Sequence, residues 1–276
     1  MKIGEQTLDL TKPVVMTIVN VTPDSFFVNS RSMHIEEISI RVAEAVSWGA
    51  RLIDVGGYST RPGAEDVPVE EELNRVMLGV EVVRDKAPGM IVSIDTFRSE
   101  VAAKVIKRHG PCIINDITAG EQDPEIFDVA AKYKVPYVLT HSKGNPKTMQ
   151  EMAEYEDVVN DIKDFFAAKI DVLRSKGVEN IIIDPGFGFA KTTPQNFRLL
   201  HRMKELRKFE LPLLIGISRK SMIYNILETT PVEALTGTAA LHWACLHGGA
   251  NILRVHDTHA AIEVIKLFNY YKNVNG

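Results

Sequence analysis

The chain has 276 residues, of which 45% are hydrophobic and 25% are charged. These values are ordinary for a globular protein, and a chain of this length can form two small domains or one large barrel. Its formal net charge of −4 gives no electrostatic reason to expect nucleic acid or an anionic membrane surface as a partner. We therefore expect neither.

The cysteines and the N-terminus bear on the compartment. Cys112 and Cys245 both lie in apolar stretches, which favours buried, reduced thiols over a disulfide or a metal site. Residues 1–10 lack the apolar core of a signal peptide, and no apolar run is long enough to span a membrane. A cytoplasmic protein is predicted.

Short apolar runs recur along the chain, and each is followed by polar or glycine-rich residues and then by a helical pattern. The predicted strands are 14–20, 51–57, 90–95, 111–116, 136–141, 180–186, 211–218 and 250–256. The predicted helices lie near 35–48, 70–86, 98–109, 124–133, 155–176, 195–208, 231–247 and 259–271. Many strands are apolar on both faces, as parallel strands covered by helices are.

This alternation predicts an α/β fold. Eight strand–helix units without an obvious linker indicate a single (β/α)₈ TIM barrel that occupies residues 1–276 as one domain. A doubly wound sheet is the weaker alternative, because no glycine fingerprint follows the first strand. Residues 1–10 are predicted to form a short hairpin or strand that closes the bottom of the barrel.

Polar side chains follow almost every predicted strand. They are Asn20, Asp54, Asp95, Asn115, Asp116, His141, Asp184, Ser218, Arg219, Lys220, Arg254 and His256. In such barrels the chemistry takes place at the carboxyl ends of the strands. Asp95, Asn115 and Asp184 could converge on a flat, nitrogen-rich ring, because carboxylates accept hydrogen bonds from ring N–H groups and an amide both donates and accepts.

The stretch "PLLIGISRKSMI" (212–223) is an apolar run that ends abruptly in cations. Buried cations need a partner, and the loops after the seventh and eighth strands often form a phosphate site. Lys220 and Arg254 are therefore predicted to face an anionic or heterocyclic ligand. A Schiff-base role for Lys220 is the alternative, but the neighbouring Arg219 and a helix start at Ser221 suit anion recognition equally well.

Two long irregular segments, 20–30 and 56–68, follow the first and second strands and are rich in Gly, Pro, Ser and Thr. Long loops on a rigid scaffold are more often functional than not. Arg61 in the second segment could clamp a phosphate.

Seven motifs, in order, give the chain a family resemblance. "VNVTPDSF", "GGYSTRPGA", "SIDTFRSEVA", "INDI", "DPGFGFAKT", "GISRKS" and "RVHD" resemble the motifs of dihydropteroate synthases over essentially the whole chain. The resemblance implies condensation of 6-hydroxymethyl-7,8-dihydropterin diphosphate with 4-aminobenzoate, which yields 7,8-dihydropteroate and diphosphate in folate synthesis. It also implies a Mg²⁺ cofactor and a homodimer, and the reaction it implies is the one that sulfonamides target.

The resemblance also implies residue roles. Asp95, Asn115, Asp184, Lys220 and Arg254 would hold the pterin; Asn20, Arg61, Arg254 and His256 the diphosphate; and Phe26, Thr60, Pro62, Phe189 and Ser221 the aminobenzoate. Asn20 would help to bind Mg²⁺. Asp95, Lys220, Arg254 and Asn20 would be the catalytic residues.

The chain departs from the family pattern in places. Tyr58 stands where Glu is common, "FFVNS" replaces a more glycine-rich ending of the first loop, "THSKG" replaces the usual "MHM" text, and Ala190 replaces a Gly. None of these changes removes a residue expected to touch the pterin. A pterin-binding methyltransferase on the same barrel and a non-catalytic pterin-binding protein are the rival functions.

Overall fold

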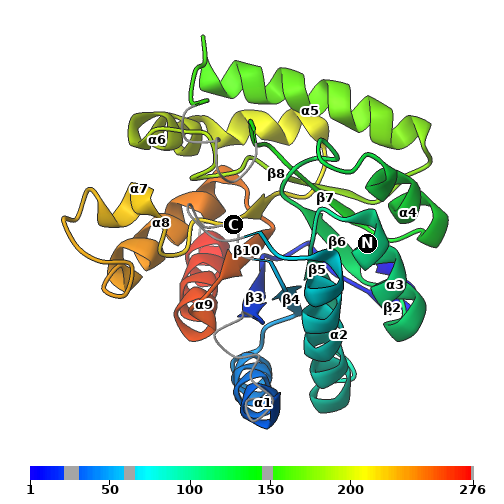
Figure 1. Cartoon of the computed structure of the whole chain (residues 1–276). Helices are drawn as coiled ribbons and strands as arrows, with labels where there is room; N and C mark the ends of the chain where they lie inside the picture. Colours follow the sequence, from blue (N-terminus) through cyan, green and yellow to red (C-terminus); the bar gives the residue numbers. More distant parts are fainter. Residues whose placement is uncertain (22–30, 59–65, 145–151, 275–276) are drawn as a thin grey trace.

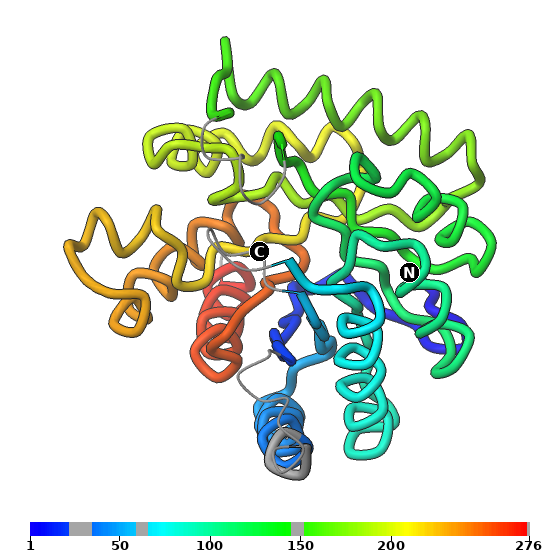
Figure 2. Tube along the Cα trace, in the orientation of Figure 1, coloured from blue at the N-terminus to red at the C-terminus, as the bar shows by residue number. Residues whose placement is uncertain are grey.

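The computed structural model describes all residues except 22–30, 59–65, 145–151 and 275–276, and the side chains of 31–34 (Figure 2). Eight parallel strands form the central sheet, and helices surround it (Figure 1). The strands are β3 (Val14–Asn20), β4 (Leu52–Gly56), β5 (Ile91–Asp95), β6 (Ile113–Asp116), β7 (Tyr137–Thr140), β8 (Ile181–Asp184), β9 (Leu214–Ile215) and β10 (Ile252–Val255).

The strand order distinguishes a barrel from a doubly wound sheet. The hydrogen-bonded order is β8-β7-β6-β5-β4-β3-β10-β9, so consecutive strands are neighbours and β3 lies beside β10. Ile183 of β8 forms a parallel bridge with Leu213, and its N–H donates to the Pro212 carbonyl at 2.9 Å. The sheet is thus nearly closed into a barrel, which confirms the predicted (β/α)₈ fold. A doubly wound sheet would require the strand order to reverse.

An apolar layer forms the floor of the barrel. It takes one side chain from every strand: Met16, Leu52, Ile91, Ile113, Val138, Ile182, Leu214 and Ile252. A two-stranded antiparallel hairpin, β1 (Lys2–Ile3) with β2 (Gln6–Thr7), precedes the barrel. Its Ile3, together with Leu8, packs on the floor and is almost fully buried. The predicted hairpin at the bottom is therefore confirmed, and apolar burial is what holds it there.

The helices cover the outside of the sheet (Figure 1). They are α1 (Arg31–Trp48), α2 (Val69–Lys86), α3 (Ser99–His109), α4 (Glu125–Tyr133), α5 (Val158–Ser175), α6 (Thr193–Arg202), α7 (Ser221–Tyr224), α8 (Leu235–Gly248) and α9 (Thr258–Val274), with a 3₁₀ helix, η2 (Met203–Phe209), after α6. The predicted helix 195–208 is thus an α-helix that tightens into a 3₁₀ helix.

Local side-chain hydrogen bonds explain two shifted boundaries. The helix predicted from 155 begins at Val158, because the Asp157 side chain accepts the N–H groups of Val159 and Asn160 at 2.9 and 3.0 Å. The helix predicted from 231 begins at Leu235. Before it, the Thr229 hydroxyl donates to Glu233 at 2.7 Å, which favours a turn over a helix there.

The cysteines and the helices bear on the expectations about disulfides and membrane spans. Cys112 and Cys245 are free and buried, as predicted, and burial raises the pKa of the Cys112 thiol to about 11. Among the residues that the structure describes, no helix combines the length and the apolar character needed to cross a membrane.

Candidate active site

The interior of the barrel turns polar directly above its floor. Side chains two positions apart on a strand point to the same face. Two positions after the floor residues stand Ile18, Asp54, Ser93, Asn115, Thr140, Asp184, Gly216 and Arg254. The acids, amide and hydroxyls in this layer are at most 7% exposed. Burying so many polar groups costs free energy, so packing alone does not account for this layer.

The register of the strands brings three of the predicted site residues to one level. Asn20 of β3 pairs with Gly56 of β4, Gly56 with Asp95 of β5, and Asp95 with Asn115 of β6. Gly56 has no side chain between its neighbours: a Cβ there would lie 3.4 Å from Asn20 Oδ1 and 3.5 Å from Asp95 Cβ. The carboxyl ends of three strands thus present an amide, a carboxylate and a second amide side by side.

Arg254 links two carboxylates inside the barrel. Its Nε donates to Asp54 Oδ2 at 2.6 Å, and its Nη2 donates to Asp95 Oδ2 at 2.6 Å. Asn115 Nδ2 donates to the same Asp54 oxygen at 3.0 Å. Asp54 is fully buried, whereas the side chains of Arg254 and Asp95 are 20% and 14% exposed. Asp54 therefore anchors Arg254 and Asn115 from inside the barrel, and the partly exposed Arg254 and Asp95 are the groups of this cluster that a ligand can reach.

Burial shifts the acids of the site. It raises the pKa of Asp95 to about 7; the Arg254 cation opposes this shift and the Asp54 charge adds to it. Burial also raises the pKa of Asp184, against the nearby Lys220 cation and the Gly186 N–H, which donates to Asp184 Oδ1 at 2.8 Å. Both acids are held where a ligand with N–H donors would favour their ionised forms.

Lys220 points toward the loop after β8. Its Nζ donates to the Phe187 carbonyl and lies 4.1 Å from the centre of the Phe189 ring, a cation–π contact. Burial lowers the pKa of Lys220 to about 8, although the Asp184 charge opposes the shift. Phe189 is half-buried in this contact, and Ser221 is exposed as the first residue of α7.

His256 lies at the end of β10 as a neutral group. Its Nδ1 is 3.2 Å from Ser218 Oγ, and its backbone N–H donates to the same oxygen at 3.2 Å. Burial, followed by the charge of Arg254, lowers the pKa of His256 to about 4. Near pH 7 the imidazole can therefore offer a hydrogen bond to an anion but no charge of its own.

Arg219, which the sequence suggested for anion recognition, is paired with a carboxylate of the chain itself. Its Nε and Nη2 donate to the two carboxylate oxygens of Asp257 at 2.7 and 2.8 Å, and Nη1 donates to the Pro231 carbonyl at 2.8 Å. The backbone at Arg219 adopts the left-handed conformation, with φ +55°. This turn directs the two adjacent cations to different places, with Arg219 fastened to Asp257 and Lys220 facing the barrel mouth.

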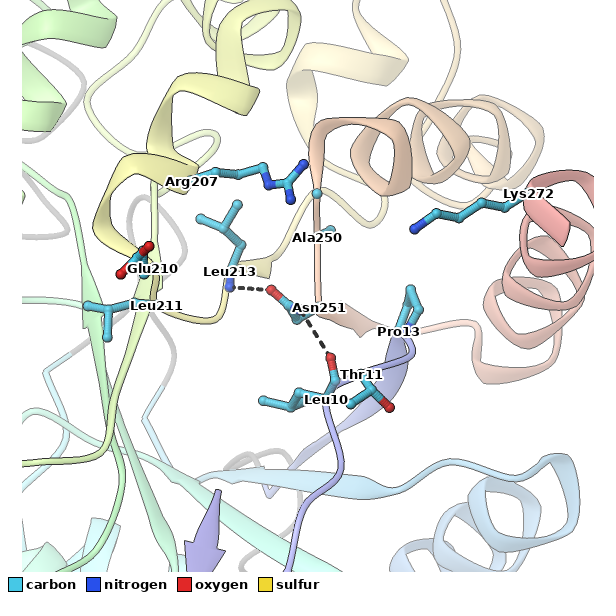
Figure 3. Close-up of a pocket in the computed structure, with 11 residues that line it drawn as sticks. Leu10, Thr11, Pro13, Arg207, Glu210, Leu211, Leu213, Ala250, Asn251 and Lys272 are labelled. Atoms are coloured by element: carbon cyan, nitrogen blue, oxygen red, sulfur yellow. Dashed lines mark hydrogen bonds between the residues drawn. The ribbon is translucent and has the colours of Figure 1, made fainter. Parts of the chain in front are cut away.

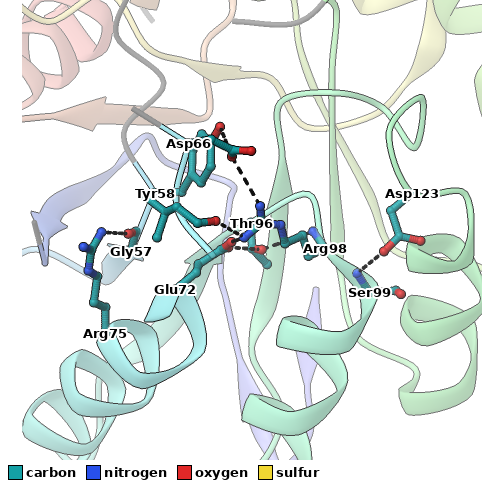
Figure 4. A network of polar contacts seen from close by, with 10 residues as sticks. Gly57, Tyr58, Asp66, Glu72, Arg75, Thr96, Arg98, Ser99 and Asp123 are labelled. Carbon is teal, nitrogen blue, oxygen red and sulfur yellow. Dashed lines mark hydrogen bonds and ion pairs between the residues drawn. The ribbon is translucent and has the colours of Figure 1, made fainter. Parts of the chain in front are cut away.

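Four predicted site residues, Phe26, Thr60, Arg61 and Pro62, lie outside the described residues. The residues that flank 59–65 are joined by a polar network (Figure 4). Within it, Arg98 Nη1 donates to the fully buried Glu72 at 2.7 Å, and the Tyr58 hydroxyl donates to Asp66 at 3.0 Å. Tyr58, where the family pattern has Glu, thus takes part in a hydrogen bond across the two flanks.

Sequence reasoning assigned no role to three members of the polar layer. Asp54 Oδ1, Ser93 Oγ and Thr140 Oγ1 are buried and have no hydrogen-bond partner within the described part of the chain. A usable signal was the alternation along each strand: once Leu52, Ile91 and Val138 are placed on the floor, the residues two positions on must also point inward.

A surface pocket lies at the opposite end of the barrel (Figure 3). Pro13, Leu213 and Asn251, each just before a strand, line it together with the exposed Arg207 and Lys272. Asn251 Oδ1 accepts from Leu213 N–H at 2.9 Å, and Nδ2 donates to the Leu10 carbonyl at 3.3 Å. This end joins the strand starts to the hairpin, and none of the predicted site residues lines it.

Comparison with known proteins agrees with this geometry. The family model described as pterin binding enzyme matches residues 16–256. Dihydropteroate synthase of Synechocystis sp. is 42% identical over 269 residues, which cover 96% of this chain and 92% of the relative. Dihydropteroate synthase of Escherichia coli is 41% identical over 263 residues, which cover 95% and 92%.

The chain belongs to the dihydropteroate synthase family. A crystal structure of Yersinia pestis dihydropteroate synthase with a sulfonamide drug complex is similar at a TM-score of 0.90 and 37% identity, covering 99% of both chains. The Xanthomonas albilineans dihydropteroate synthase with 4-aminobenzoic acid is similar at a TM-score of 0.86 and 36% identity, covering 96% of this chain and 95% of that one. Both the fold and the sequence of this chain are therefore those of a dihydropteroate synthase.

Proposed function

We propose that the protein condenses 6-hydroxymethyl-7,8-dihydropterin diphosphate with 4-aminobenzoate to 7,8-dihydropteroate and diphosphate. The observation that carries this is the polar layer of the barrel interior, in which Asp54, Asn115, Asp184 and Arg254 stand above an apolar floor. A layer of buried acids and amides suits a heterocycle rich in N–H donors and ring acceptors. Membership of the dihydropteroate synthase family supplies the substrate class.

In this proposal the pterin enters the mouth of the barrel. The carboxylates of Asp95 and Asp184 would accept its N–H groups, and Asn115 would use its free carbonyl side, since its Nδ2 already donates to Asp54. Arg254 would stack on the ring from the position in which Asp54 and Asp95 hold it. Lys220 would donate to the ring, either with a second N–H group while the first stays on the Phe187 carbonyl or after leaving that carbonyl.

The reacting bond is the CH₂–O bond of the pterin diphosphate. We propose that it breaks first, with its electron pair leaving on the diphosphate, because the ring nitrogens share the resulting positive charge. The amine of 4-aminobenzoate then forms the C–N bond with its lone pair and loses one proton to solvent. An arylamine is neutral at pH 7, so this step needs no strong base from the protein.

The leaving diphosphate would be met by Asn20, Arg61, Arg254 and His256. A cation that neutralises developing charge on a leaving group lowers the barrier, and Arg254 is already fixed in place. A neutral His256 would donate one N–H, with its Nδ1 held at Ser218. Phe189 and Ser221, with Phe26, Thr60 and Pro62, would border the aminobenzoate.

A magnesium ion fits these residues only in part. No group of three or more His, Cys, Asp or Glu side chains that could hold a metal is found among the described residues. Mg²⁺ commonly takes one or two protein oxygens and completes its shell with phosphate and water. The exposed Asn20 side chain beside Asp95 offers such an oxygen. When bound there, the ion would supply charge neutralisation to the diphosphate.

One assay tests the reaction directly. The protein is incubated with the pterin diphosphate, Mg²⁺ and radiolabelled 4-aminobenzoate, and labelled dihydropteroate is separated from the labelled substrate. Product that requires both substrates supports the proposal, and Lys220→Met should reduce it sharply. Pterin binding without product would instead indicate a non-catalytic pterin-binding protein or a methyltransferase.

We also propose a homodimer that forms through the outer face of α8 and α9. Trp243 of α8 packs edge-on against Phe268 and Tyr271 of α9, with ring centroids 5.5 Å apart in both pairs. Leu267 and Tyr270 beside them are 65% and 74% exposed. Exposed apolar groups of this size gain from being covered. Sedimentation equilibrium should give twice the chain mass, and Tyr270→Glu should lower the measured mass.

A cytoplasmic location is likewise a prediction, which cell fractionation would test.

A further inference from the structure

We propose that Lys191 is a positioning residue that shapes the loop after β8 from inside, and thereby places Lys220 and Phe189 for the two substrates. The proposal rests on the function proposed above and extends it to a residue that does not itself reach the mouth of the barrel. Lys191 lies near the end of that loop, which connects β8 to α6, and only 4% of it is exposed.

The Lys191 amine has three partners, and they converge from two strand ends. Nζ donates to the carbonyls of Gly186 and Phe189, both at 3.0 Å, and lies 3.0 Å from His141 Nδ1 at the end of β7. The two carbonyls can only accept, so Nζ donates to both, and the direction of its contact with Nδ1 depends on the tautomer of His141. Burial lowers the pKa of Lys191 well below its usual value, and a neutral amine still has two N–H groups for the two carbonyls. Removing the amine would leave two buried carbonyls and one ring nitrogen without this partner.

The loop needs such an internal donor because of its backbone. Gly186, Gly188 and Ala190 all have left-handed backbones, with φ of +68°, +80° and +47°. Alternating left-handed residues turn successive carbonyls to different sides, and those of Gly186 and Phe189 point at Nζ. A Cβ at Gly186 would come within 1.9 Å of the His141 carbonyl oxygen, so the loop lies tightly against the end of β7.

Other contacts fasten the outer side of the same loop. The Tyr155 hydroxyl donates to the Ala190 carbonyl at 2.9 Å, and the Asn196 side chain accepts the Gly188 N–H at 2.8 Å. Ala190, which stands where the family pattern has Gly, keeps a left-handed backbone that is unfavourable for a non-glycine residue. The loop is therefore a strained turn held from both sides, and Lys191 is its inner support.

The loop after β8 makes two contacts with Lys220. Phe187 supplies the carbonyl that accepts from Lys220 Nζ, and Phe189 supplies the ring 4.1 Å from the same atom. A Cβ at Gly188 would lie 2.9 Å from Lys220 Cδ, which shows how closely the loop borders that side chain. Lys191 thus acts on the substrates through Lys220 and Phe189.

The first test replaces Lys191 with Met, which keeps the length of the side chain and removes its donors. Hydrogen exchange of residues 185–192 should become about tenfold faster or more, because the inner contacts of the turn are lost. The KM for both substrates, measured well below the melting temperature, should rise about tenfold, with kcat changed by less than about threefold.

The control is Arg84→Met at the other end of the barrel. Arg84 also donates to two backbone carbonyls, those of Met90 and Pro111, at 3.2 and 3.0 Å. This variant should lower the melting temperature and leave both KM values unchanged. If Lys191→Met behaves like Arg84→Met in exchange at 185–192 and in KM, Lys191 has only a structural role and the proposal is overturned.

A second pair of variants covers the case in which Lys191→Met does not fold. His141→Asn keeps a hydrogen-bonding amide close to the position of Nδ1, whereas His141→Leu removes it. The proposal expects the KM values of the Leu variant to exceed those of the Asn variant by about threefold or more; equal values overturn it. If the wild-type protein forms no dihydropteroate, the proposed function fails, and the hydrogen-exchange comparison still decides the role of Lys191.

Discussion

Arg254 and Asp54 form an ion pair inside the barrel, with 2.6 Å between Nε and Oδ2. A second N–H group of the guanidinium, on Nη2, donates to Asp95 Oδ2 at the same distance. The two carboxylates fix the plane of the guanidinium before any ligand arrives. A cation in a preformed orientation costs less reorganisation when charge develops beside it. Asp54 is therefore a support for Arg254 and, through Asn115 Nδ2, for a second site residue.

Replacing Asp54 with Asn should test this support. The amide keeps the shape but removes the charge and places a donor or a single acceptor between Arg254 and Asn115. Disturbing a buried ion pair costs on the order of 3 kcal/mol, part of which should appear as a lower melting temperature. The KM for the pterin diphosphate should rise about tenfold, measured beside an unchanged KM for aminobenzoate. A pterin KM equal to that of the wild type would contradict the role.

The raised pKa of Asp95 predicts a pH-dependent stability. Burial raises this pKa from 3.8 to about 7 in the folded protein, so between those pH values the folded state binds more protons than the unfolded state. The contribution of Asp95 is then fully present below about pH 4 and is lost as the pH rises through 7, by up to about 1.4 kcal/mol per pH unit.

Urea unfolding of the wild type and of Asp95→Asn at pH 5 and pH 8 measures this effect. The wild type should lose more free energy of unfolding between the two pH values than the Asn variant does. Other buried acids, such as Asp116 and Glu72, contribute to both proteins and cancel in the comparison. Parallel losses in the two proteins would contradict the assignment to Asp95.

Thr140→Val should stabilise the protein without ligand. The Thr140 hydroxyl is buried and has no partner among the described residues, and replacing it with a methyl group removes the cost of an unmet hydrogen bond. We expect a gain of about 1 kcal/mol in the free energy of unfolding.

The matched control is Thr17→Val. The Thr17 hydroxyl is equally buried, but it shares a hydrogen bond of 2.7 Å with the Thr258 hydroxyl. This change should instead lower the free energy of unfolding by about 1 kcal/mol. Chemical denaturation of both variants decides the point, since losses of similar size would mean that the Thr140 hydroxyl is satisfied after all.

Two substitutions of Ser221 distinguish the contribution of the backbone N–H groups from that of the side chain at the proposed aminobenzoate site. It is the exposed first residue of α7, and the first N–H groups of a helix lack partners within the helix. Ser221→Ala should raise the KM for aminobenzoate modestly, because the N–H groups remain. Ser221→Asp should raise it far more, by tenfold or beyond, since a negative charge would face the substrate carboxylate. The measurement is that KM at saturating pterin diphosphate, and equal effects of the two changes would remove the carboxylate from this position.

Much of the architecture followed from local pattern. Runs apolar on both faces predicted the parallel strands, and the absence of a glycine fingerprint after Asn20 favoured a barrel over a doubly wound sheet. Polar residues at strand ends predicted a shared site, because parallel strands end at the same rim. The strand at 211–218 was predicted too long, since only Leu214 and Ile215 form it, and the length of pairing depends on neighbours far away in the chain.

What the sequence by itself determined is therefore the alternation of elements, the family and the residue types at the rim. The pairings were decided only by the tertiary structure. Arg219 turns away to Asp257, Lys191 turns inward to His141, and Arg254 reaches Asp54 across 200 positions of sequence. The physical reason is that neighbours in sequence, such as the cations Arg219 and Lys220, can point to different places, depending on the direction of the backbone at each residue. That direction is set by the left-handed backbone at Arg219, whose side chain is held by Asp257 from the far end of the chain.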